Sequence, residues 1–313
     1  MPSLELMPLS QANPRLMVAL MGEEERAWFS ELGWDFSQIR KILTAFIEQS
    51  LLPGFVAIKD GKAVGYAYFL IHSGKGILGS LFISKEDYPP EVAEDLLSLA
   101  VDALKSAEAI HRIEAQLMPF HNTNLTAAFT RHGFRVYRRY FLELDLNIGP
   151  WRREHNPDLR ILPWSPPFLP LISEVLFLSY RDEIDATLCD DYRSLPDCEG
   201  YLRSLIENPG CGVFMPDASF LGLDDHGKPC GFVLGSRISD SGGMIPQIAI
   251  LPSQQGCGMG KALMQHALSQ FRAIGLHTVS LTVTKANQRA FAWYQRLGFR
   301  IRKEFGAYVW ERP

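Results

Sequence analysis

The chain has 313 residues, of which 47 % are hydrophobic and 21 % are charged. This length exceeds the ~100–200 residues of a typical domain, so two domains are expected. The composition is that of a globular protein and excludes a disordered, collagen-like or disulfide-scaffold chain. The formal net charge of -4 gives no global basic surface, which argues against a dedicated nucleic-acid-binding protein.

The sequence lacks the patterns of a targeting or membrane-spanning segment. Its most apolar stretch, residues 168–178, is interrupted by Pro170, Ser173 and Glu174 and falls short of the ~18–20 apolar residues that span a bilayer. The first residues do not combine a basic region with an apolar core, as a secretion signal would. We therefore expect a cytoplasmic protein with no membrane partner.

Cysteine and histidine usage gives no indication of a disulfide framework or a metal site. The five cysteines form no C-x-x-C pair, and their odd number favours reduced thiols. The eight histidines show no spacing typical of metal ligands, so no metal is expected. The cysteines are Cys189, Cys198, Cys211, Cys230 and Cys257.

Two segments of the first half recur in the second half. Residues 59–66 (KDGKAVGY) match residues 225–232 (DHGKPCGF) at an offset of 166. Residues 122–135, which end in Gly-Phe-Arg, match residues 287–300 at an offset of 165. Because the offset is nearly constant over widely spaced segments, we predict two copies of one domain.

The repeat sets the predicted domain boundaries. The copies are expected at residues 1–147 and 159–313, separated by a linker at 148–158 that is rich in charges and breakers. Within each copy, strands and helices alternate around a mixed sheet, which is an α/β or α+β architecture. In the second copy a helical stretch ends at Asn208, and the further expected elements in chain order are strands at 219–223, 230–237 and 244–251, a helix at 258–273, a strand at 278–283, a helix at 288–297 and a strand at 305–310.

The most informative run is IAILPSQQGCGMGKAL, residues 248–263. Gly256, Gly258 and Gly260 lie between an apolar strand and an amphipathic helix, where backbone N–H groups and the helix dipole favour an anion. A Walker A loop is excluded because the glycine spacing is one residue too short and Ala262 follows Lys261. A dinucleotide fingerprint is excluded because its third glycine position holds Lys261.

The run resembles the pyrophosphate loop of the GNAT superfamily of acyl-CoA-dependent N-acyltransferases, whose pattern is Q/R-x-x-G-x-G/A. A second block of that family also matches, namely an Asn at the start of the next helix, a Tyr two turns later and Leu-Gly-Phe. These residues are Asn287, Tyr294 and residues 297–299. The resemblance covers residues 159–313 and, more weakly, the first copy.

The resemblance implies two tandem domains, each with a mixed, mostly antiparallel sheet flanked by helices, and acetyl-CoA as co-substrate. The strand backbone would bind the pantetheine arm, and one of its N–H groups would stabilise the oxyanion by roughly 3 kcal/mol. Tyr294 would be the catalytic acid that protonates the departing CoA thiolate. The expected cofactor-binding residues are Ile248, Ala249, Ile250, Gln255, Gly256, Cys257, Gly258, Met259, Gly260, Lys261 and Asn287.

Each role has a structural alternative. The glycines could form only a tight turn, Tyr294 could be a packing residue, and Asn287 could be only a helix N-cap. A catalytic Cys257 is disfavoured because no histidine stands near it in sequence. The general base is not identified, since Gln247 stands where many relatives have a Glu on the strand before the loop.

The segment 181–199 contains seven acids against two arginines and is expected to border the acceptor site in this fold. A cationic amine substrate is one interpretation of this acidity, and a solvated acidic helix face is the other.

The first copy lacks the features that carry this chemistry. Aligning Ile83 with Ile250 places Pro89, Glu91 and Ala93 at the three glycine positions, and Phe129 replaces Tyr294. A glutamate there would repel a phosphate, so this copy is expected to keep the fold without binding acyl-CoA.

The predicted function is transfer of an acetyl group from acetyl-CoA to an amine by direct attack, with a small molecule favoured as the partner. The tandem layout resembles that of the mycothiol synthase family, which suggests a thiol-containing or amino-sugar amine by analogy. The alternative is a catalytically idle acyl-CoA-binding sensor or interaction module. Protein or peptide acetylation is a third interpretation and would require an open groove.

Overall fold

The computed structural model describes residues 4–85, 90–118, 125–149 and 159–313. The chain divides into two compact units. The first unit comprises residues 1–139 and 304–313, and the second unit comprises residues 140–303. Most of the expected linker, residues 150–158, lies outside the described residues. No helix in the described part of the chain is long and apolar enough to cross a membrane.

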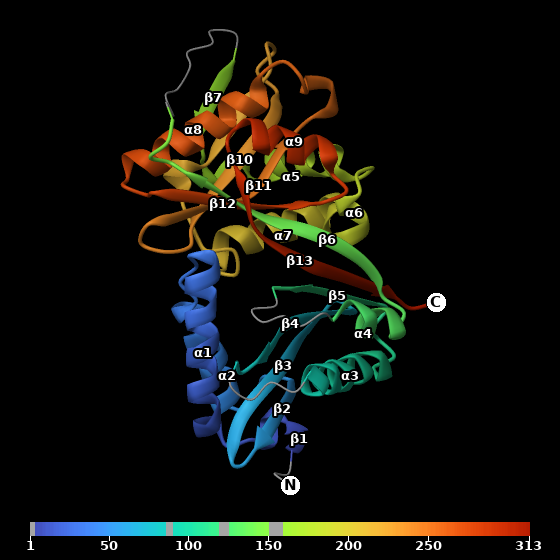
Figure 1. The fold of residues 1–313 in the computed structure, drawn as a ribbon. Coiled ribbons are helices and arrows are strands. Elements are labelled where there is room, and N and C mark those ends of the chain that lie inside the picture. The colour runs from blue at the N-terminus through green and yellow to red at the C-terminus, as the bar shows by residue number, and fades with distance from the viewer. Residues whose placement is uncertain (1–3, 86–89, 119–124, 150–158) are drawn as a thin grey trace. The chain divides into compact units, whose positions relative to one another are not determined.

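The first unit is a mixed sheet with helices on both faces (Figure 1). Its strand order is β1-β2-β3-β4-β5-β13, and the pairing of β4 with β5 is parallel. Its elements are β1 (Leu4–Pro8), α1 (Pro14–Leu32), α2 (Ser37–Glu48), β2 (Gly54–Lys59), β3 (Lys62–His72), β4 (Lys75–Ile83), α3 (Pro90–Ser106), β5 (Arg112–Leu117) and α4 (Thr126–Arg131).

Alternating side chains of the central strands build two separate cores in this unit. Ala57 and Ala67 face α3, whereas Val56, Tyr66 and Tyr68 face α1 and α2. This alternation is the period of two expected for a strand that is buried on both faces. The hairpin of β2 and β3 confirms the strand, turn and second strand that the sequence predicted for residues 59–66.

The second unit repeats this layering. Its strand order is β6-β12-β11-β10-β9-β7, with β8 also on β10, and β11 with β12 is parallel. The elements are β6 (Arg135–Asp145), β7 (Arg160–Pro163), α5 (Leu169–Tyr180), α6 (Asp185–Leu188), α7 (Leu195–Glu207), β8 (Val213–Phe214), β9 (Phe220–Leu223), β10 (Pro229–Arg237), β11 (Gly242–Ile250), α8 (Met259–Ala273), β12 (Thr278–Thr284), α9 (Gln288–Arg296) and β13 (Arg300–Glu311).

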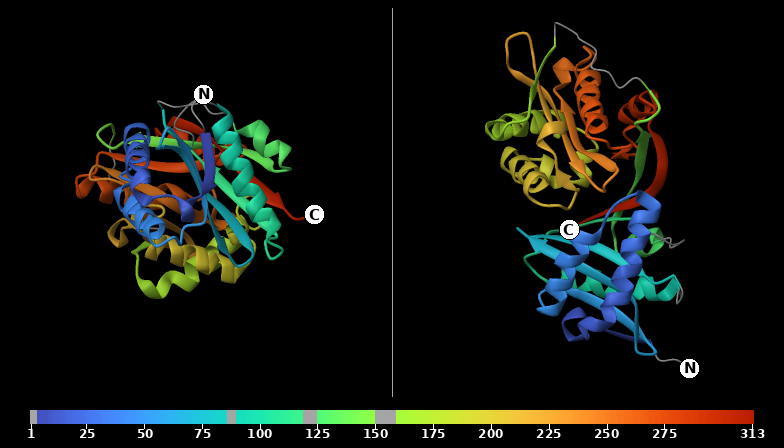
Figure 2. Two further views of the ribbon diagram at one scale, coloured as in Figure 1. Left: turned by 90° about the horizontal axis from the view of Figure 1, so that it is seen from below. Right: turned by 90° about the vertical axis from the view of Figure 1, so that its left-hand side faces the viewer.

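The strands of the second unit also bury both faces. Leu221, Phe232 and Leu234 pack against α5 and α7, whereas Phe220 and Val233 pack against α8. Figure 2 shows these two helical layers on opposite sides of the orange strands. The mixed, mostly antiparallel sheet flanked by helices that the sequence predicted is therefore confirmed.

The compact units do not coincide with the expected sequence copies 1–147 and 159–313, because the last strand of each copy crosses into the other unit. Strand β6 ends the first copy, yet residues from Tyr140 onward belong to the second unit, where Leu142 and Leu144 join the core. Strand β13 ends the second copy, yet its residues 306–311 pair antiparallel with β5 of the first unit. The repeat in the sequence gave no sign of this exchange.

Specific contacts hold the C-terminal strand in the first unit. The Tyr308 ring stacks on Phe129 with 3.7 Å between ring centroids, and both side chains are buried. The carboxylate of Glu311 accepts a hydrogen bond of 2.5 Å from buried Arg112. The Arg312 guanidinium donates to carbonyls at and beyond the end of α3. Phe129, which stands where the second copy has Tyr294, is therefore a core residue.

We expect Tyr308→Ala to destabilise the first unit by about 3–5 kcal/mol, because a large buried ring is lost from its core. Hydrogen exchange followed by mass spectrometry should show faster exchange within residues 1–139. Ile301→Ala, on the 48 % exposed part of the same strand, is the matched control and should change little. Equal loss of protection in residues 140–303 would contradict the assignment of this strand.

A buried carboxyl group lies between α1 and the sheet of the first unit. Glu24 is 1 % exposed and accepts hydrogen bonds from the hydroxyls of Tyr66 and Ser80 and from the Trp28 indole. Burial raises the pKa of Glu24, although these three donors act in the opposite direction. The charged form of Glu24 is therefore less favourable in the folded state than in the unfolded state.

This raised pKa predicts a pH-dependent stability. The folded state binds the Glu24 proton more tightly than the unfolded state does. This proton therefore stabilises the fold below the ordinary glutamate pKa of 4.5, and the stabilisation is lost as the pH rises through the folded pKa. Glu24→Gln removes this dependence, so the melting temperature of the variant minus that of the wild type should increase between pH 4.5 and 7. Glu48→Gln, at an exposed position, is the control and should give a flat difference.

Candidate active site

A β-bulge opens one edge of strand β11. Ser236 pairs with Met244 and Leu234 pairs with Gln247, so two residues of β11 oppose one residue of β10. The parallel register between β11 and β12 ends at Met244 opposite Ser280. Beyond this point residues 245–250 keep β10 on one edge, and their other edge is not paired with β12.

The register determines which backbone groups face the open edge. The Leu251 N–H donates to the Cys230 carbonyl, so by antiparallel alternation Ala249 directs its backbone groups to β10. Ile248 and Ile250 direct theirs to the open edge. Of the three strand residues expected to bind pantetheine, these two present backbone groups there, whereas Ala249 does not.

Side chains of the same unit donate hydrogen bonds to the outward carbonyls of Ile248 and Ile250. The Tyr180 hydroxyl donates to the Ile248 carbonyl at 3.0 Å. The Gln255 side-chain amide donates to the Ile250 carbonyl at 3.2 Å. Gln255, expected as a loop residue that binds the cofactor, therefore also ties the loop to the end of β11.

The glycine loop has a conformation that requires glycine at two positions. Gly256 has φ 87° and Gly258 has φ 94°, in the left-handed region that other residues rarely adopt. Gly258 is the N-cap of α8, and the first bond of the helix runs from the Ala262 N–H to the Gly258 carbonyl. The amides of Met259 and Gly260 in the first turn thus have no acceptor within the helix, and they form one side of an anion-binding end.

The remaining loop residues lie around this helix end. Cys257 is exposed, and its thiol donates to the Gln254 carbonyl at 2.8 Å. Met259 is buried against Gly222, so only its backbone faces the loop. Lys261 lies in the first turn of α8. The expected cofactor-binding residues from 255 to 261 are therefore contiguous at one end of α8.

Asn287 is the N-cap of α9 and has a second contact. Its side-chain oxygen accepts from the Ala290 N–H at 3.1 Å, as the structural alternative anticipated. Its side-chain nitrogen donates to the Asp185 carboxylate at 3.2 Å, and the Thr284 hydroxyl donates to the other Asp185 oxygen at 2.5 Å. The carboxylate of Asp185 thus joins α6 to the end of β12 and the start of α9.

Tyr294 is packed in the core beside this carboxylate. It is 8 % exposed and meets the Phe299 ring edge to face at 5.8 Å. Burial, with a smaller contribution from the charge of Asp185, raises the pKa of Tyr294. Its hydroxyl is therefore protonated at neutral pH, as a proton donor requires, and its ring also has the packing role that the sequence left open.

Three further tyrosines, which the sequence did not single out, cover the open edge from α5, the segment after α6, and α7. The hydroxyls of Tyr192 and Tyr201 both donate to the Gln247 side-chain oxygen at 3.2 Å. The Tyr180 and Tyr192 rings lie 4.8 Å apart. Burial raises the pKa of Tyr180 and Tyr192 well above the ordinary value. The neutral hydroxyls and the Gln247 amide therefore make a polar, uncharged wall.

The first unit has an equivalent edge with different contacts. A bulge places Tyr68 opposite Ser80 and Phe69 opposite Leu78, and the parallel register with β5 ends at Leu78. Glu23 accepts hydrogen bonds from the Ser84 hydroxyl at 2.8 Å and from the Lys85 N–H at 2.6 Å. The segment that follows this strand is thus tied to α1.

The residues expected at the glycine positions of the first copy differ in kind. Glu91 lies in the first turn of α3, and Ala93 is fully buried, whereas Pro89 lies outside the described residues. Asn122, the counterpart of Asn287, also lies outside them.

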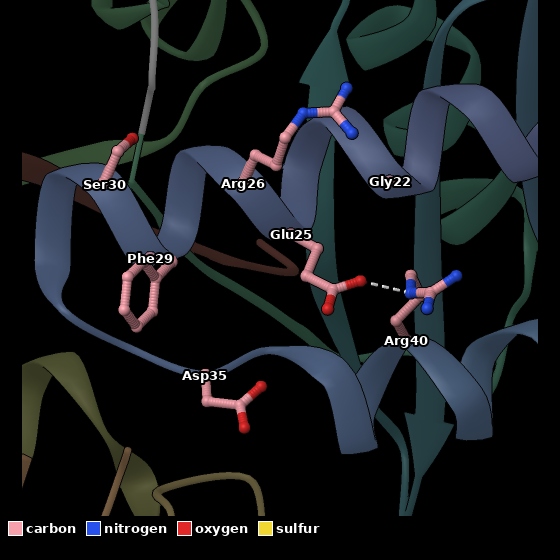
Figure 3. Close-up of a pocket in the computed structure, with 7 residues that line it drawn as sticks. All are labelled: Gly22, Glu25, Arg26, Phe29, Ser30, Asp35 and Arg40. Atoms are coloured by element: carbon pink, nitrogen blue, oxygen red, sulfur yellow. Dashed lines mark ion pairs between the residues drawn. The ribbon is translucent and has the colours of Figure 1, made fainter. Parts of the chain in front are cut away.

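A hollow of about 660 Å³ lies between α1 and α2 of the first unit (Figure 3). Glu25 and Arg40 form an ion pair across it, with Asp35 and Phe29 at its rim. None of the expected site residues lines this hollow. No group of His, Cys, Asp or Glu side chains suited to a metal ion occurs among the described residues.

Comparison with known proteins finds a family match in the second copy and relatives that span both copies. Residues 182–299 match the model of the acetyltransferase (GNAT) family. A mycothiol acetyltransferase from Acidimicrobium ferrooxidans is 29 % identical over 272 residues, which is 82 % of this chain and 82 % of that protein. The relationship thus extends over both copies.

Solved structures share the fold over the whole chain. A GCN5-related N-acetyltransferase from Sphaerobacter thermophilus covers 99 % of this chain and 96 % of its own, with a TM-score of 0.73 at 15 % identity. A tandem GNAT protein from the clavulanic acid biosynthesis pathway covers 99 % of each chain, with a TM-score of 0.65 at 12 % identity. The fold is shared with a tandem GNAT protein over the whole chain. Residues 182–299 match the GNAT family of acetyltransferases, and that family implies acetyl-CoA as acyl donor.

Gly260 allows a test of the glycine loop without backbone strain. A Cβ there would meet Ile250 and Trp293 at 3.5 and 3.7 Å, which is ordinary contact. We expect Gly260→Ala to bind acetyl-CoA nearly as the wild type does. Gly260→Asp should weaken binding at least ~100-fold, because a carboxylate beside a pyrophosphate costs several kcal/mol, while an acid in the first turn favours the helix itself. Calorimetric titration with acetyl-CoA measures the affinity of both variants. Equal affinities would contradict the assignment of this loop to the cofactor.

Proposed function

We propose that the second copy, residues 159–313, transfers an acetyl group from acetyl-CoA to a small-molecule amine, and that the first copy keeps the fold without this activity. The observation that carries the proposal is the open edge of β11 between the glycine loop and Tyr294. A donor that enters there meets outward backbone groups, an anion-binding helix end and a protonated hydroxyl within one unit.

The roles of the cofactor-binding residues follow from their placement. The pyrophosphate would lie at the amides of residues 256–261, which satisfies the helix N-terminus. The pantetheine amides would replace Tyr180 and Gln255 as partners of the outward backbone of Ile248 and Ile250. The second N–H of the Asn287 amide would donate to the same arm, since the side-chain oxygen already caps α9.

The chemistry proceeds by direct attack. An acceptor that arrives as an ammonium first loses one proton to solvent. The amine lone pair then forms a bond with the thioester carbonyl carbon, and an outward N–H of β11 stabilises the oxyanion. The carbon to sulfur bond breaks, the CoA thiolate takes a proton from the Tyr294 hydroxyl, and the nitrogen of the new amide releases its extra proton, which restores that hydroxyl. No covalent enzyme intermediate is needed, and the exposed Cys257 has no part in this step.

One comparison and one structural feature support a small molecule as the acceptor. The relative that matches both copies is named a mycothiol acetyltransferase, an enzyme with a small-molecule acceptor. The tyrosine wall of Tyr180, Tyr192 and Tyr201 covers the edge where a peptide would have to lie. A catalytically idle sensor would bind acetyl-CoA equally well, and turnover separates the two functions.

Replacing Tyr294 with Phe tests the catalytic role. The ring and its packing remain, whereas the proton donor is lost, so CoA release should fall by ~10²- to 10⁴-fold. Affinity for acetyl-CoA, measured by calorimetry, should stay within about threefold of the wild type. Phe299→Leu, which alters the same aromatic contact and keeps the hydroxyl, is the control and should retain most of the turnover. Wild-type turnover in Tyr294→Phe would remove the assigned role.

A further inference from the structure

The transfer also requires a place for the acceptor amine, and α6 supplies an acidic side chain near the open edge. We propose that Asp185 is the acceptor-binding carboxylate, and that the acceptor is a small amine held there as an ammonium beside the ring of Tyr180. This inference rests on the proposed acetyltransferase function and specifies the substrate side of the same site.

The contacts of Asp185 place its charge at the junction of the site. One oxygen accepts from the Thr284 hydroxyl at the end of β12, and the other accepts from the Asn287 amide at the start of α9. Its charge also contributes to the raised pKa of both Tyr180 and Tyr294, so it acts on both hydroxyls. The carboxylate is therefore close enough to the hydroxyls of Tyr180 and Tyr294 to oppose the ionisation of both.

Asp185 has neutral partners only. Among the described residues no Lys, Arg or His forms an ion pair with it, and its side chain is half-buried. An ionised carboxylate has roughly four acceptor positions, of which two are used here. A half-buried charge with only neutral donors gains from a cation, so the free positions fit an ammonium.

The surrounding groups suit a cation. The Tyr180 and Tyr192 rings lie 4.8 Å apart beside this edge, and aromatic faces attract ammonium groups. Their hydroxyls and that of Tyr294 remain neutral, so they do not repel the carboxylate. Gln247 adds an uncharged oxygen. No group named in this cluster would exclude a positive charge.

Four other acids of segment 181–199 have side-chain contacts elsewhere. Glu199 pairs with Arg203, and Asp197 accepts the Ser194 hydroxyl at the start of α7. Asp191 accepts the Cys189 thiol. Asp182 pairs with its neighbour Arg181, and its side chain is 88 % exposed. The Asp185 carboxylate instead accepts hydrogen bonds from Thr284 at the end of β12 and from Asn287 at the start of α9, which separates it from a solvated acidic face.

The test compares Asp185→Asn with Asp182→Asn, which removes the same charge from the same segment at an exposed position. CoA release is measured with acetyl-CoA and a panel of primary amines, namely a short diamine, an amino sugar and an amino-acid amide. For the best acceptor of the wild type, Asp185→Asn should raise the KM at least ~10-fold, because a hydrogen bond to a charge is lost. The Kd of acetyl-CoA should not change, and Asp182→Asn should behave as the wild type.

Three results would overturn the proposal. An unchanged acceptor KM in Asp185→Asn would show that the acceptor does not meet this carboxylate. A loss of acetyl-CoA affinity equal to that of Asn287→Ala would show that Asp185 only positions Asn287. A loss of equal size in Asp182→Asn would show a general effect of charge.

A direct binding measurement separates this proposal from the function on which it rests. Ligand-observed NMR with the same amines and no acetyl-CoA reports on the ammonium site alone. Amine binding to the wild type that is lost in Asp185→Asn supports the site even if the protein releases no CoA, and equal binding to both proteins overturns it. Absence of acetyl-CoA binding would contradict the proposed function instead.

Discussion

The bulge in β11 is the constraint on which the candidate site depends. One extra residue between Met244 and Gln247 turns the strand, so its parallel pairing with β12 stops at Met244. Backbone groups that a regular sheet would pair are left facing outward, and they require other partners because unpaired buried polar groups are costly. Side chains of Tyr180 and Gln255 are those partners now, and a pantetheine arm carries amides of the same kind.

The two copies depend on each other, because each one contributes its last strand to the unit that holds most of the other copy. The core of the first unit includes Tyr308, and the core of the second unit includes Leu142 and Leu144, so each unit uses a strand from the other copy. The first copy is therefore more than an appendage, because its last strand lies in the unit that holds the glycine loop. This dependence gives a physical reason for a copy without the loop to persist.

The sequence predicted the elements of the second copy well, because each had a local signal. Helix α8 follows a glycine with positive φ, and helix α9 starts at an asparagine whose side chain caps it. The strand exchange had no such signal, since residues 305–310 read as a strand wherever they pair. The tyrosine wall and Asp185 were also missed as a group, because α5, α6 and α7 bring them to the edge only in three dimensions. Pro246, inside an apolar strand, was the one available sign of the bulge.

The two copies show how one fold can keep or lose a site through the polar residues at the same edge. Both retain the bulge and the short parallel register. In the first unit Glu24 takes the hydroxyls of Tyr66 and Ser80, and Glu23 takes the backbone after β4. Glu24 thus binds polar side chains of the strands from within, and Glu23 ties the end of this edge to α1. In the second unit, neutral tyrosines and Gln247 lie at the equivalent edge of β11. The acidic side chain, Asp185, lies instead at the end of β12 and the start of α9. The polar residues at this edge therefore differ between the two copies, which fits the proposal that only the second copy binds acyl-CoA.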